Sequence, residues 1–563
     1  MSRRSVGRQY VVELAGLRKA FDPASASKKL ALVRKLKAVS VSSPADLRKY
    51  HDTLCYMRAF PDSEELFHAA HESLLDFHRR VSRLNADSRI ALWDTGIGGT
   101  PVHYAFSYEV ARWLAQNAPG QISVDWEEVG SDTSRLDELL MPLQLPVETD
   151  YFDSGYITSK EWIDLVSASA DGTDFDWLFA QLRTLRALPS VSHLYDSADL
   201  PLAWNLSDSP LSKSGNVLPV QEVIARHQGM RKVPRNAKAD IQKPISAIAK
   251  LPIGYGRRLI DVAMAALAVR HRETLHFNHA NPGEVYLANV GRGVSIAVFG
   301  LREAFRYPLE CTMGYLVLSN GVPIAYGGSS IFFRQANTGI NFFDEYRGSE
   351  AAFLWVQVLR VYHQLVGCTR FIANPYQFGA ENDEALESGA YWFYHRLGFR
   401  SVSPAIRKLA LREQEKMRRQ PAYRSSIGTL RRLASCDLQL TLPSARAKEF
   451  FEEDWFDTAS MLATRELGAA GGSTRAEAES NIANRVSKKL GIRNLDTWSR
   501  SEQNAFRQLA PILAATDLST WPVGQKRLAR KLLRAKGGTL EARYARLLGQ
   551  NDFLFSKLKA ACQ

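Results

Sequence analysis

The sequence predicts an α/β protein of several domains. Its 563 residues exceed one ordinary domain, since about 150 residues per domain allows two to four of them. The hydrophobic share of 45% and the charged share of 23% are those of a folded chain, which excludes a mostly disordered or collagen-like protein. Segments with helical spacing alternate with short apolar runs that are typical of strands.

From these changes in pattern we divide the chain into four regions. Residues 1–88 are expected to be helical, and residues 89–255 to form an α/β region that ends in a basic, proline-rich linker. Residues 256–405 are expected to form a domain around a mixed sheet, and residues 406–563 a basic helical region.

The chain is expected to be cytoplasmic. It holds no apolar run of about 18 residues, as a membrane span would need, and its N-terminus lacks the continuous apolar segment of a secretory signal. Its five cysteines are scattered singly, with no close pair for a zinc site or a redox motif. They are most simply thiols in a reducing compartment.

The helical region is clearest at residues 63–84, where apolar residues recur at helical spacing. On the same helix Glu65 and His68 have the i, i+3 spacing by which one helix can offer two metal ligands. No second Glu-x-x-His matches them, so we interpret the pair as a solvated polar helix face. Three later histidines lack a partner carboxylate beyond Glu273, and we expect no metal site there either: His271, His276 and His279.

The second region is expected to run strand (90–93), glycine-rich turn (94–100), helix (102–116) and strand (122–129). Such a turn can direct backbone N–H groups at a phosphate across a helix N-terminus. The turn lacks the full dinucleotide fingerprint, however, so a plain tight connection is the interpretation we favour. Ser, Pro, Gly and Lys accumulate over residues 200–258, which predicts a linker and a domain boundary.

Residues 285–402 carry the most informative pattern. Strands are predicted at 294–301, 314–318 and 322–326, the last two joined by Asn320-Gly321, a strong hairpin signal. A second antiparallel pair is predicted at 330–333 and 339–344. A long amphipathic helix, a buried strand at 370–373 and a helix at 384–397 follow.

Two short motifs stand at the joints of this region. The first is Arg347-Gly348-Ser349-Glu350-Ala351-Ala352, at the start of the long helix, and the second is the spacing of Ala390, Tyr394, Gly398 and Phe399. With this order of elements, the region resembles the GNAT superfamily of N-acetyltransferases over about a fifth of the chain. The resemblance implies a mixed, mostly antiparallel sheet, in which Arg347, Tyr394 and the splay between the Gly339 and Arg370 strands face one cleft.

The resemblance also implies a function, an acyl-CoA-dependent N-acyltransferase that uses acetyl-CoA or a longer acyl-CoA. The acceptor would be a small-molecule or peptide amine. Tyr394 would protonate the leaving thiolate, and Asp344 or Glu345 would deprotonate the amine. For a lone tyrosine, packing of a helix onto a sheet is the alternative role. The implied cofactor-binding residues are Phe343, Arg347, Gly348, Ser349, Ala351 and Ala352.

Glu350 departs from the family pattern, because it occupies the place of the first glycine of the pyrophosphate loop. Its carboxylate is expected to approach a pyrophosphate of the same sign of charge. Either the loop holds the cofactor differently, through Arg347 and the amides of Gly348 and Ser349, or the fold persists without coenzyme A binding. Glu387 likewise replaces a frequent asparagine of the family.

The basic residues that give the net charge of +13 gather after this domain. They fall on predicted helices, at residues 407–432 and again at 526–559, where they surround Leu528, Leu532 and Leu533 in an amphipathic pattern. Such cationic faces can hold a nucleic acid, an acidic membrane surface or an acidic partner; the alternative is a solvated helix face. The second function class is therefore a nucleic-acid-associated or other polyanion-binding protein whose GNAT-like domain is catalytically inactive.

Overall fold

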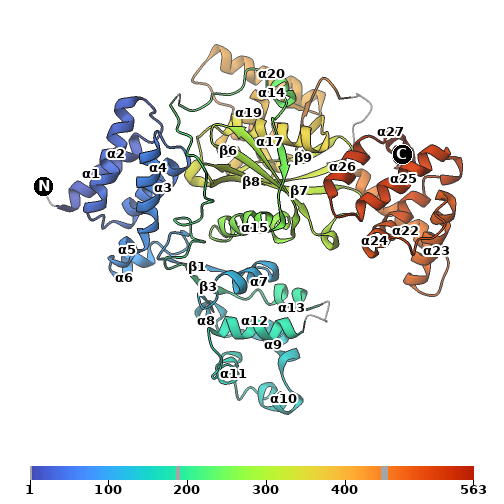
Figure 1. The fold of residues 1–563 in the computed structure, drawn as a ribbon, viewed down its shortest axis with the longest axis horizontal. Coiled ribbons are helices and arrows are strands. Elements are labelled where there is room, and N and C mark those ends of the chain that lie inside the picture. Colours follow the sequence, from blue (N-terminus) through green and yellow to red (C-terminus); the bar gives the residue numbers. More distant parts are fainter. Residues whose placement is uncertain (1–2, 186–189, 228, 446–453, 563) are drawn as a thin grey trace. The chain divides into compact units, whose positions relative to one another are not determined.

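The computed structural model describes residues 3–185, 190–227, 229–445 and 454–562. The protein is mixed α/β, with one large sheet, one small sheet and many helices (Figure 1). The chain divides into two compact units. The first holds residues 1–230, 258–279 and 318–324, and the second holds residues 231–257, 280–317 and 325–563. The four-region division by residue ranges stays a prediction, and residues 446–453 of its last region lie outside the described residues.

The first unit begins with helices that pack on one another, α1 on α3 and both α2 and α3 on α4. A three-stranded antiparallel sheet of order β1-β3-β2 follows, with further helices around it. Its elements are α1 (Arg3–Gly16), α2 (Pro23–Ala38), α3 (Pro44–Ala59), α4 (Glu64–Leu75), α5 (Phe77–Ser82), α6 (Ala86–Ile90), β1 (Pro101–Tyr104), α7 (Tyr108–Asn117), β2 (Ile122–Val124), α8 (Trp126–Val129), α9 (Ser134–Leu140), α10 (Pro146–Asp153), α11 (Ser159–Val166), α12 (Asp174–Thr184), α13 (Val191–Ala198), β3 (Leu202–Asn205) and α16 (Leu275–Asn278).

The predicted strand at 90–93 is wrong. Asn85 caps the N-terminus of α6 by accepting a hydrogen bond from the Ser88 N–H (3.0 Å). The helix that this cap stabilises ends at Ile90, and residues 91–93 form a turn. The glycine-rich turn leads into strand β1 and not into a helix, which rules out the phosphate-binding interpretation. A Cβ on Gly96 would lie 2.5 Å from the Val269 carbonyl oxygen, so the glycine serves close backbone packing, as in a plain connection.

The second unit is built on a ten-stranded sheet of order β12-β13-β11-β9-β8-β7-β6-β5-β4, with β10 paired to β8. The pair β9–β11 is parallel, while β4–β5, β5–β6, β8–β9, β8–β10, β11–β13 and β12–β13 are antiparallel. The strands are β4 (Ile248–Lys250), β5 (Ala280–Gly291), β6 (Val294–Leu301), β7 (Cys311–Ser319), β8 (Val322–Phe332), β9 (Gln335–Thr338), β10 (Asn341–Phe342), β11 (Arg370–Ala373), β12 (Arg400–Ser401) and β13 (Leu438–Thr441).

The strands predicted at 294–301, 314–318, 322–326 and 370–373 are confirmed. The predicted pairing of 330–333 with 339–344 is wrong, because residues 329–332 are the end of β8 and pair with residues 335–338 of β9. The predicted hairpin joins β7 and β8, and Asn320 and Gly321 both have positive φ, 47° and 77°. Its turn end, residues 318–324, belongs to the first unit. The predicted helix at 384–397 is interrupted by Gly389, with φ 65°, and forms α18 (Asp383–Ser388) and α19 (Ala390–Arg396).

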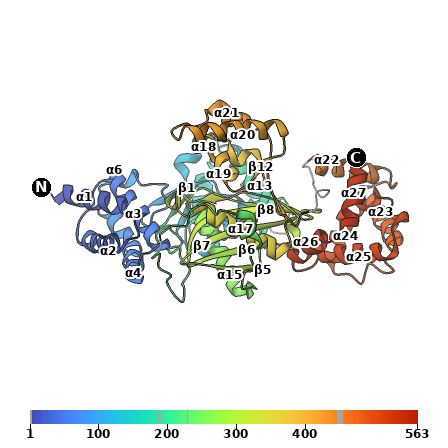
Figure 2. The ribbon, with the colours of Figure 1, turned by 90° about the horizontal axis from the view of Figure 1, so that it is seen from above.

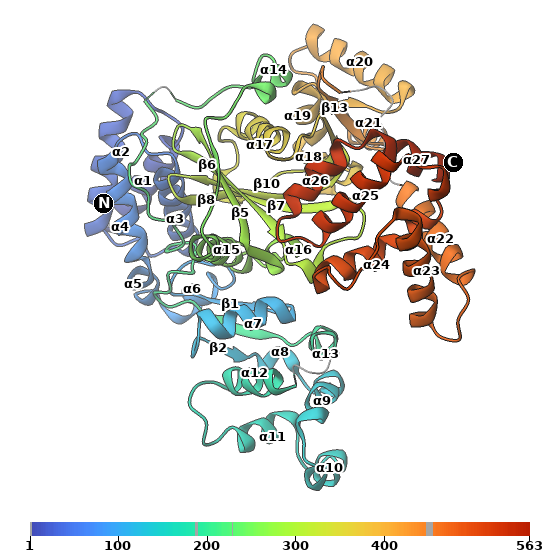
Figure 3. The same cartoon turned by 45° about the vertical axis from the view of Figure 1, so that its right-hand side comes forward.

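One long helix, α17 (Ala351–Val366), lies against the sheet (Figure 3). Its apolar side is buried, and the Tyr362 hydroxyl donates to the Met313 carbonyl of β7 (2.9 Å). The other helices that belong wholly to this unit are α14 (Ala237–Gln242), α20 (Pro404–Arg419), α21 (Ile427–Leu433), α22 (Asp454–Gly468), α23 (Arg475–Leu490), α24 (Arg500–Ala514), α25 (Val523–Lys536), α26 (Glu541–Gly549) and α27 (Asp552–Cys562), whereas α15 (Ile253–Ala268) has residues in both units. Figure 2 shows α23, α24, α25 and α27 gathered in one bundle. Within the described residues, none of the helices combines the length and apolar composition needed to cross a bilayer.

A buried charge cluster joins the C-terminal helices to the sheet. Glu284 of β5 accepts a hydrogen bond from the Ala542 N–H of α26 (2.8 Å) and pairs with Arg306 (3.4 Å). Lys536 of α25 pairs with Glu541 of α26 (2.7 Å), and all four side chains are at most 2% exposed. Desolvation is the largest influence on Glu284 and raises its pKa to about 7, above the ordinary 4.5.

This raised pKa predicts how stability depends on pH. Because the folded state holds the Glu284 proton more tightly than the unfolded state, the contribution of this group is fully present below pH 4.5 and is lost as pH rises through about 7. The loss is on the order of 3 kcal/mol. Between pH 5 and pH 8, the melting temperature of the wild type should therefore fall relative to that of Glu284→Gln. Glu387→Gln, at an exposed position, is the control and should follow the wild type at every pH. If the difference in melting temperature between the wild type and Glu284→Gln does not change with pH, the pKa of Glu284 is not raised.

Candidate functional site

The candidate site lies where β9 and β10 part from β11. Residues 335–337 of β9 pair in parallel with residues 370–372 of β11. β9 also pairs with β8, Thr338 with Ser329, and Asn341 and Phe342 continue this register by pairing with Tyr326 and Ala325 of β8. Strand β11 ends at Ala373, so β10 pairs with β8 and not with β11. The splay between the Gly339 and Arg370 strands stays a prediction, and residues 338–343 are called the diverging segment after it.

Tight packing holds this diverging segment. The Tyr315 hydroxyl donates to the Gly339 carbonyl, and a Cβ on Gly327 would lie 2.4 Å from that same hydroxyl. A Cβ on Gly339 would lie 2.2 Å from the side-chain oxygen of Gln377. Gly327 is thus required by close approach, because a Cβ there would also lie 2.6 Å from the Gly339 carbonyl oxygen, whereas the Gln377 side chain can move away from Gly339. Tyr315 and Ile340 could not be predicted from the sequence, because their role depends on strand pairing and not on a local motif.

Tyr394 of α19 lies beside the same segment. Its side chain is buried, 3% exposed. Burial raises the pKa of Tyr394 above its ordinary value of 10, and the nearby Ile340 backbone lowers it in part, so the hydroxyl stays protonated at neutral pH. The ring makes edge contacts with Phe378 (6.0 Å) and Phe399 (5.4 Å). The ring of Tyr394 therefore packs in the aromatic core, while its hydroxyl lies beside the backbone of the diverging segment.

The loop between β10 and α17 holds the remaining predicted residues. Arg347 is half-exposed and pairs with Asp344 (3.0 Å) and with Glu384 of α18 (2.5 Å). Gly348 has φ 75°, which favours glycine. The Ser349 N–H donates to the Tyr346 carbonyl (3.3 Å), so this amide is engaged within the loop.

The predicted site residues have different surroundings. Asp344 is exposed, whereas Glu345 is buried, and Phe343 is buried in a stack on Tyr326 (5.2 Å between ring centroids). Ala351 and Ala352 form the partly exposed first turn of α17. The structure thus brings Asp344 to Arg347, and Tyr394 to Ile340. That Arg347 and Tyr394 face one cleft stays a prediction.

The expected approach of Glu350 to a pyrophosphate is wrong for this conformation. The Glu350 side chain is fully buried and pairs with Arg292 at 2.8 Å. It also accepts a hydrogen bond from the Arg231 N–H (2.8 Å). An ionised carboxylate in the interior requires such partners, and they direct it inward. Because Arg292 pairs with the buried Glu350 carboxylate, the repulsion expected between this carboxylate and a pyrophosphate is weakened.

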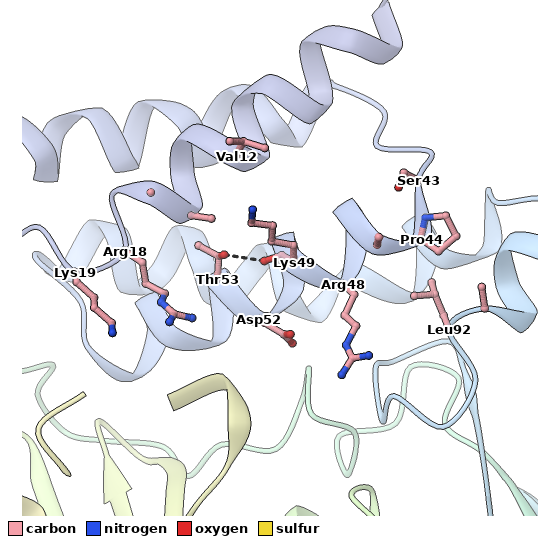
Figure 4. Close-up of a pocket in the computed structure, with 14 residues that line it drawn as sticks. Val12, Arg18, Lys19, Ser43, Pro44, Arg48, Lys49, Asp52, Thr53 and Leu92 are labelled. Carbon is pink, nitrogen blue, oxygen red and sulfur yellow. Dashed lines mark hydrogen bonds between the residues drawn. The ribbon is translucent and has the colours of Figure 1, made fainter. Parts of the chain in front are cut away.

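A hollow lies in the first unit, between α1 and α3 (Figure 4). Its volume is about 1060 Å³, and four cations line it: Arg18, Lys19, Arg48 and Lys49. Asp52 is the acidic residue among its lining groups. This hollow could not be predicted from the sequence, because Arg18 and Lys19 lie in the turn after α1 while Arg48 and Lys49 lie on α3.

No metal cluster takes part in either place. Across the residues that the structure describes, no group of three or more His, Cys, Asp or Glu side chains has the geometry to hold an ion. The Nε2 atom of His68, a residue that the sequence pairs with Glu65 as a possible metal ligand, lies 3.5 Å from the Oε1 atom of Glu64.

Comparison with known proteins adds no relative. No family model, no curated protein and no solved structure matches the chain. The chemistry of the site is therefore argued from its residues.

The buried position of Glu350 predicts a stability effect. Glu350→Ala removes the carboxylate that Arg292 contacts and should lower the free energy of unfolding by about 3 kcal/mol. Arg347→Ala, which breaks an exposed pair beside it, should lower it by less than about 1 kcal/mol. Thermal melting of both variants checks this, and a Glu350→Ala protein as stable as the wild type would show that the carboxylate does not anchor the loop.

Proposed function

We propose that the protein is an acyl-CoA-dependent N-acyltransferase that acts on a small-molecule or peptide amine in the cytoplasm. The observation that supports the proposal is the position of the Tyr394 hydroxyl, which is buried beside the Ile340 backbone in the segment that follows β9. A proton donor and a backbone amide thus lie close together within the sheet. These are two of the groups that acyl transfer from a thioester requires.

The loop residues fit an acyl-CoA. Glu350 is turned inward to Arg292, which leaves Arg347 as the charged side chain of this loop that can reach a phosphate. Arg347 would exchange Glu384 for the phosphate, an exchange between two exposed partners that involves little desolvation. Gly348, Ala351 and Ala352 carry no bulky side chain at the start of α17.

Acetyl-CoA or a longer acyl-CoA supplies the acyl group as a thioester. The Ile340 N–H can polarise a carbonyl placed against the diverging segment. Tyr394, protonated because burial raises its pKa, can give its proton to a leaving thiolate. Of the two candidate bases, Asp344 is exposed and can accept a proton from an amine, while Glu345 is buried.

A second candidate is a catalytically inactive GNAT-like domain in a polyanion-binding protein. The observation that favours it is the burial of Tyr394 among Trp355, Phe378 and Phe399, because a substrate sulfur must reach the hydroxyl through this aromatic packing. The two candidates differ in whether the protein binds and consumes acyl-CoA.

The proposal predicts that Tyr394→Phe separates binding from turnover. Phenylalanine keeps the ring contacts and removes the proton donor, so calorimetric titration with acetyl-CoA and longer acyl-CoAs should give an affinity close to that of the wild type. Thiol release in the presence of a panel of amines should fall by about 100-fold.

Tyr391→Phe is the matched control, because Tyr391 is a buried tyrosine one turn earlier on the same helix. It should leave thiol release unchanged. If the wild type neither binds acyl-CoA nor releases thiol with any amine, the inactive-domain candidate replaces the acyltransferase.

A further inference from the structure

The excess positive charge of the chain is confined to its last region. Residues 406–563 contain 29 of the 72 basic residues and 16 of the 59 acidic residues, a surplus of 13. This surplus equals the net charge of the entire chain, +13, so the rest of the chain is balanced. A surplus gathered in one region indicates an anionic partner there.

Part of this charge lines a hollow beside α25. The hollow has a volume of about 480 Å³ and is formed by α25 and by the segment that joins α23 to α24. Five cations and one aromatic residue line it: Arg493, Arg527, Arg530, Lys531, Arg534 and Trp498.

Two of the five cations are engaged within the protein. Arg534 pairs with Glu502 (2.9 Å), and its guanidinium lies 5.5 Å from the centroid of the Trp498 ring. Arg530 donates to the Leu490 carbonyl at the end of α23. These contacts fix the wall of the hollow.

The other three cations are available to a ligand. Within the described part of the chain, the side chains of Arg493, Arg527 and Lys531 are exposed and have neither a hydrogen bond nor an ion pair. Like charges held in one hollow repel one another, and an anion between them relieves that repulsion.

The joining segment is also fixed in place. The Ser487 hydroxyl donates to the Ile492 carbonyl (3.2 Å), and the Gln503 side chain donates to the Trp498 carbonyl (3.0 Å). The Thr497 hydroxyl donates to the Asn494 carbonyl (2.9 Å). A hollow with fixed walls needs little reordering to accept a ligand.

The geometry favours a chain of phosphates over a membrane surface. Arg527, Lys531 and Arg534 follow one another at i, i+4 and i+7, on one face of α25 and over about 10 Å of its length. The apolar side chains opposite, Ala529, Leu532 and Leu533, are buried in the bundle and unavailable to a bilayer. Trp498 is only 9% exposed, so it offers no stacking surface for a base.

We propose that this hollow binds the phosphodiester backbone of a nucleic acid, with Arg493, Arg527 and Lys531 as the phosphate contacts and without selection of sequence. The proposal is independent of the acyltransferase proposed above, since neither Arg347 nor Tyr394 takes part in it.

The test is fluorescence anisotropy of the full chain with a labelled 20-nucleotide single-stranded DNA of mixed sequence, over a range of salt concentrations. The triple variant Arg493→Gln, Arg527→Gln, Lys531→Gln should bind at least about tenfold more weakly than the wild type at low salt. Its slope of log affinity against log salt should be smaller by about 2, because three phosphate contacts each contribute about 0.7.

The control is Lys19→Gln, Arg48→Gln, Lys49→Gln, which removes the same charge from the hollow between α1 and α3. It should keep wild-type affinity and slope, and melting temperatures should show that both variants are folded. Equal losses in the two variants would reduce the effect to net charge and overturn the proposal. So would absence of DNA binding by the wild type, or loss of binding to phosphatidylserine vesicles in the first variant without loss of DNA binding.

Discussion

Strand β9 pairs on both sides, with β8 and β11, whereas Asn341 and Phe342 of β10 pair with β8 and not with β11, and the proposed chemistry depends on this one-sided pairing. A strand paired on both sides has no spare amide for a ligand. Here the Tyr315 hydroxyl donates to the Gly339 carbonyl, and the buried Tyr394 hydroxyl lies beside the Ile340 backbone. The two tyrosines hold the segment in place.

The buried charged residues hold parts of the second unit together, whereas the charged residues proposed to bind ligands lie at the surface. The buried carboxylates Glu284 and Glu350 each face an arginine, and both pairs join distant parts of the second unit. Arg347 and Asp344, only a few residues from Glu350, stay at the surface. An inward Glu350 anchors the start of α17 while the outer side of the loop keeps its positive residue. Near the C-terminus, Arg493, Arg527 and Lys531 of the hollow beside α25 have no such partner among the described residues, which distinguishes them from its engaged cations Arg530 and Arg534.

Much of the sheet could be predicted from the sequence, because its signals are local. Apolar runs gave residues 294–301 and 370–373 as strands, and Asn320-Gly321 specified the hairpin through two positive φ angles. Strand β9 at residues 335–338 could not be predicted, since it depends on pairing with both β8 and β11, and of the strand predicted at 339–344 only Asn341 and Phe342 form one. The direction of Glu350 depends on Arg292, 58 residues earlier in the chain, and no local pattern reveals that contact. The prediction of a strand at 90–93 was wrong because Asn85 caps a short helix there, and this cap favours helix more than the short apolar run favours a strand.

The acyltransferase proposal requires an acyl-CoA to lie along residues 338–353. Hydrogen exchange of the full chain, followed by mass spectrometry with and without acetyl-CoA, measures this, because bound ligand slows exchange of the amides it covers. We expect slower exchange in peptides that span residues 338–353, with no change in peptides from α23 to α25. Unchanged exchange over residues 338–353 at saturating acetyl-CoA would show that acyl-CoA does not bind there.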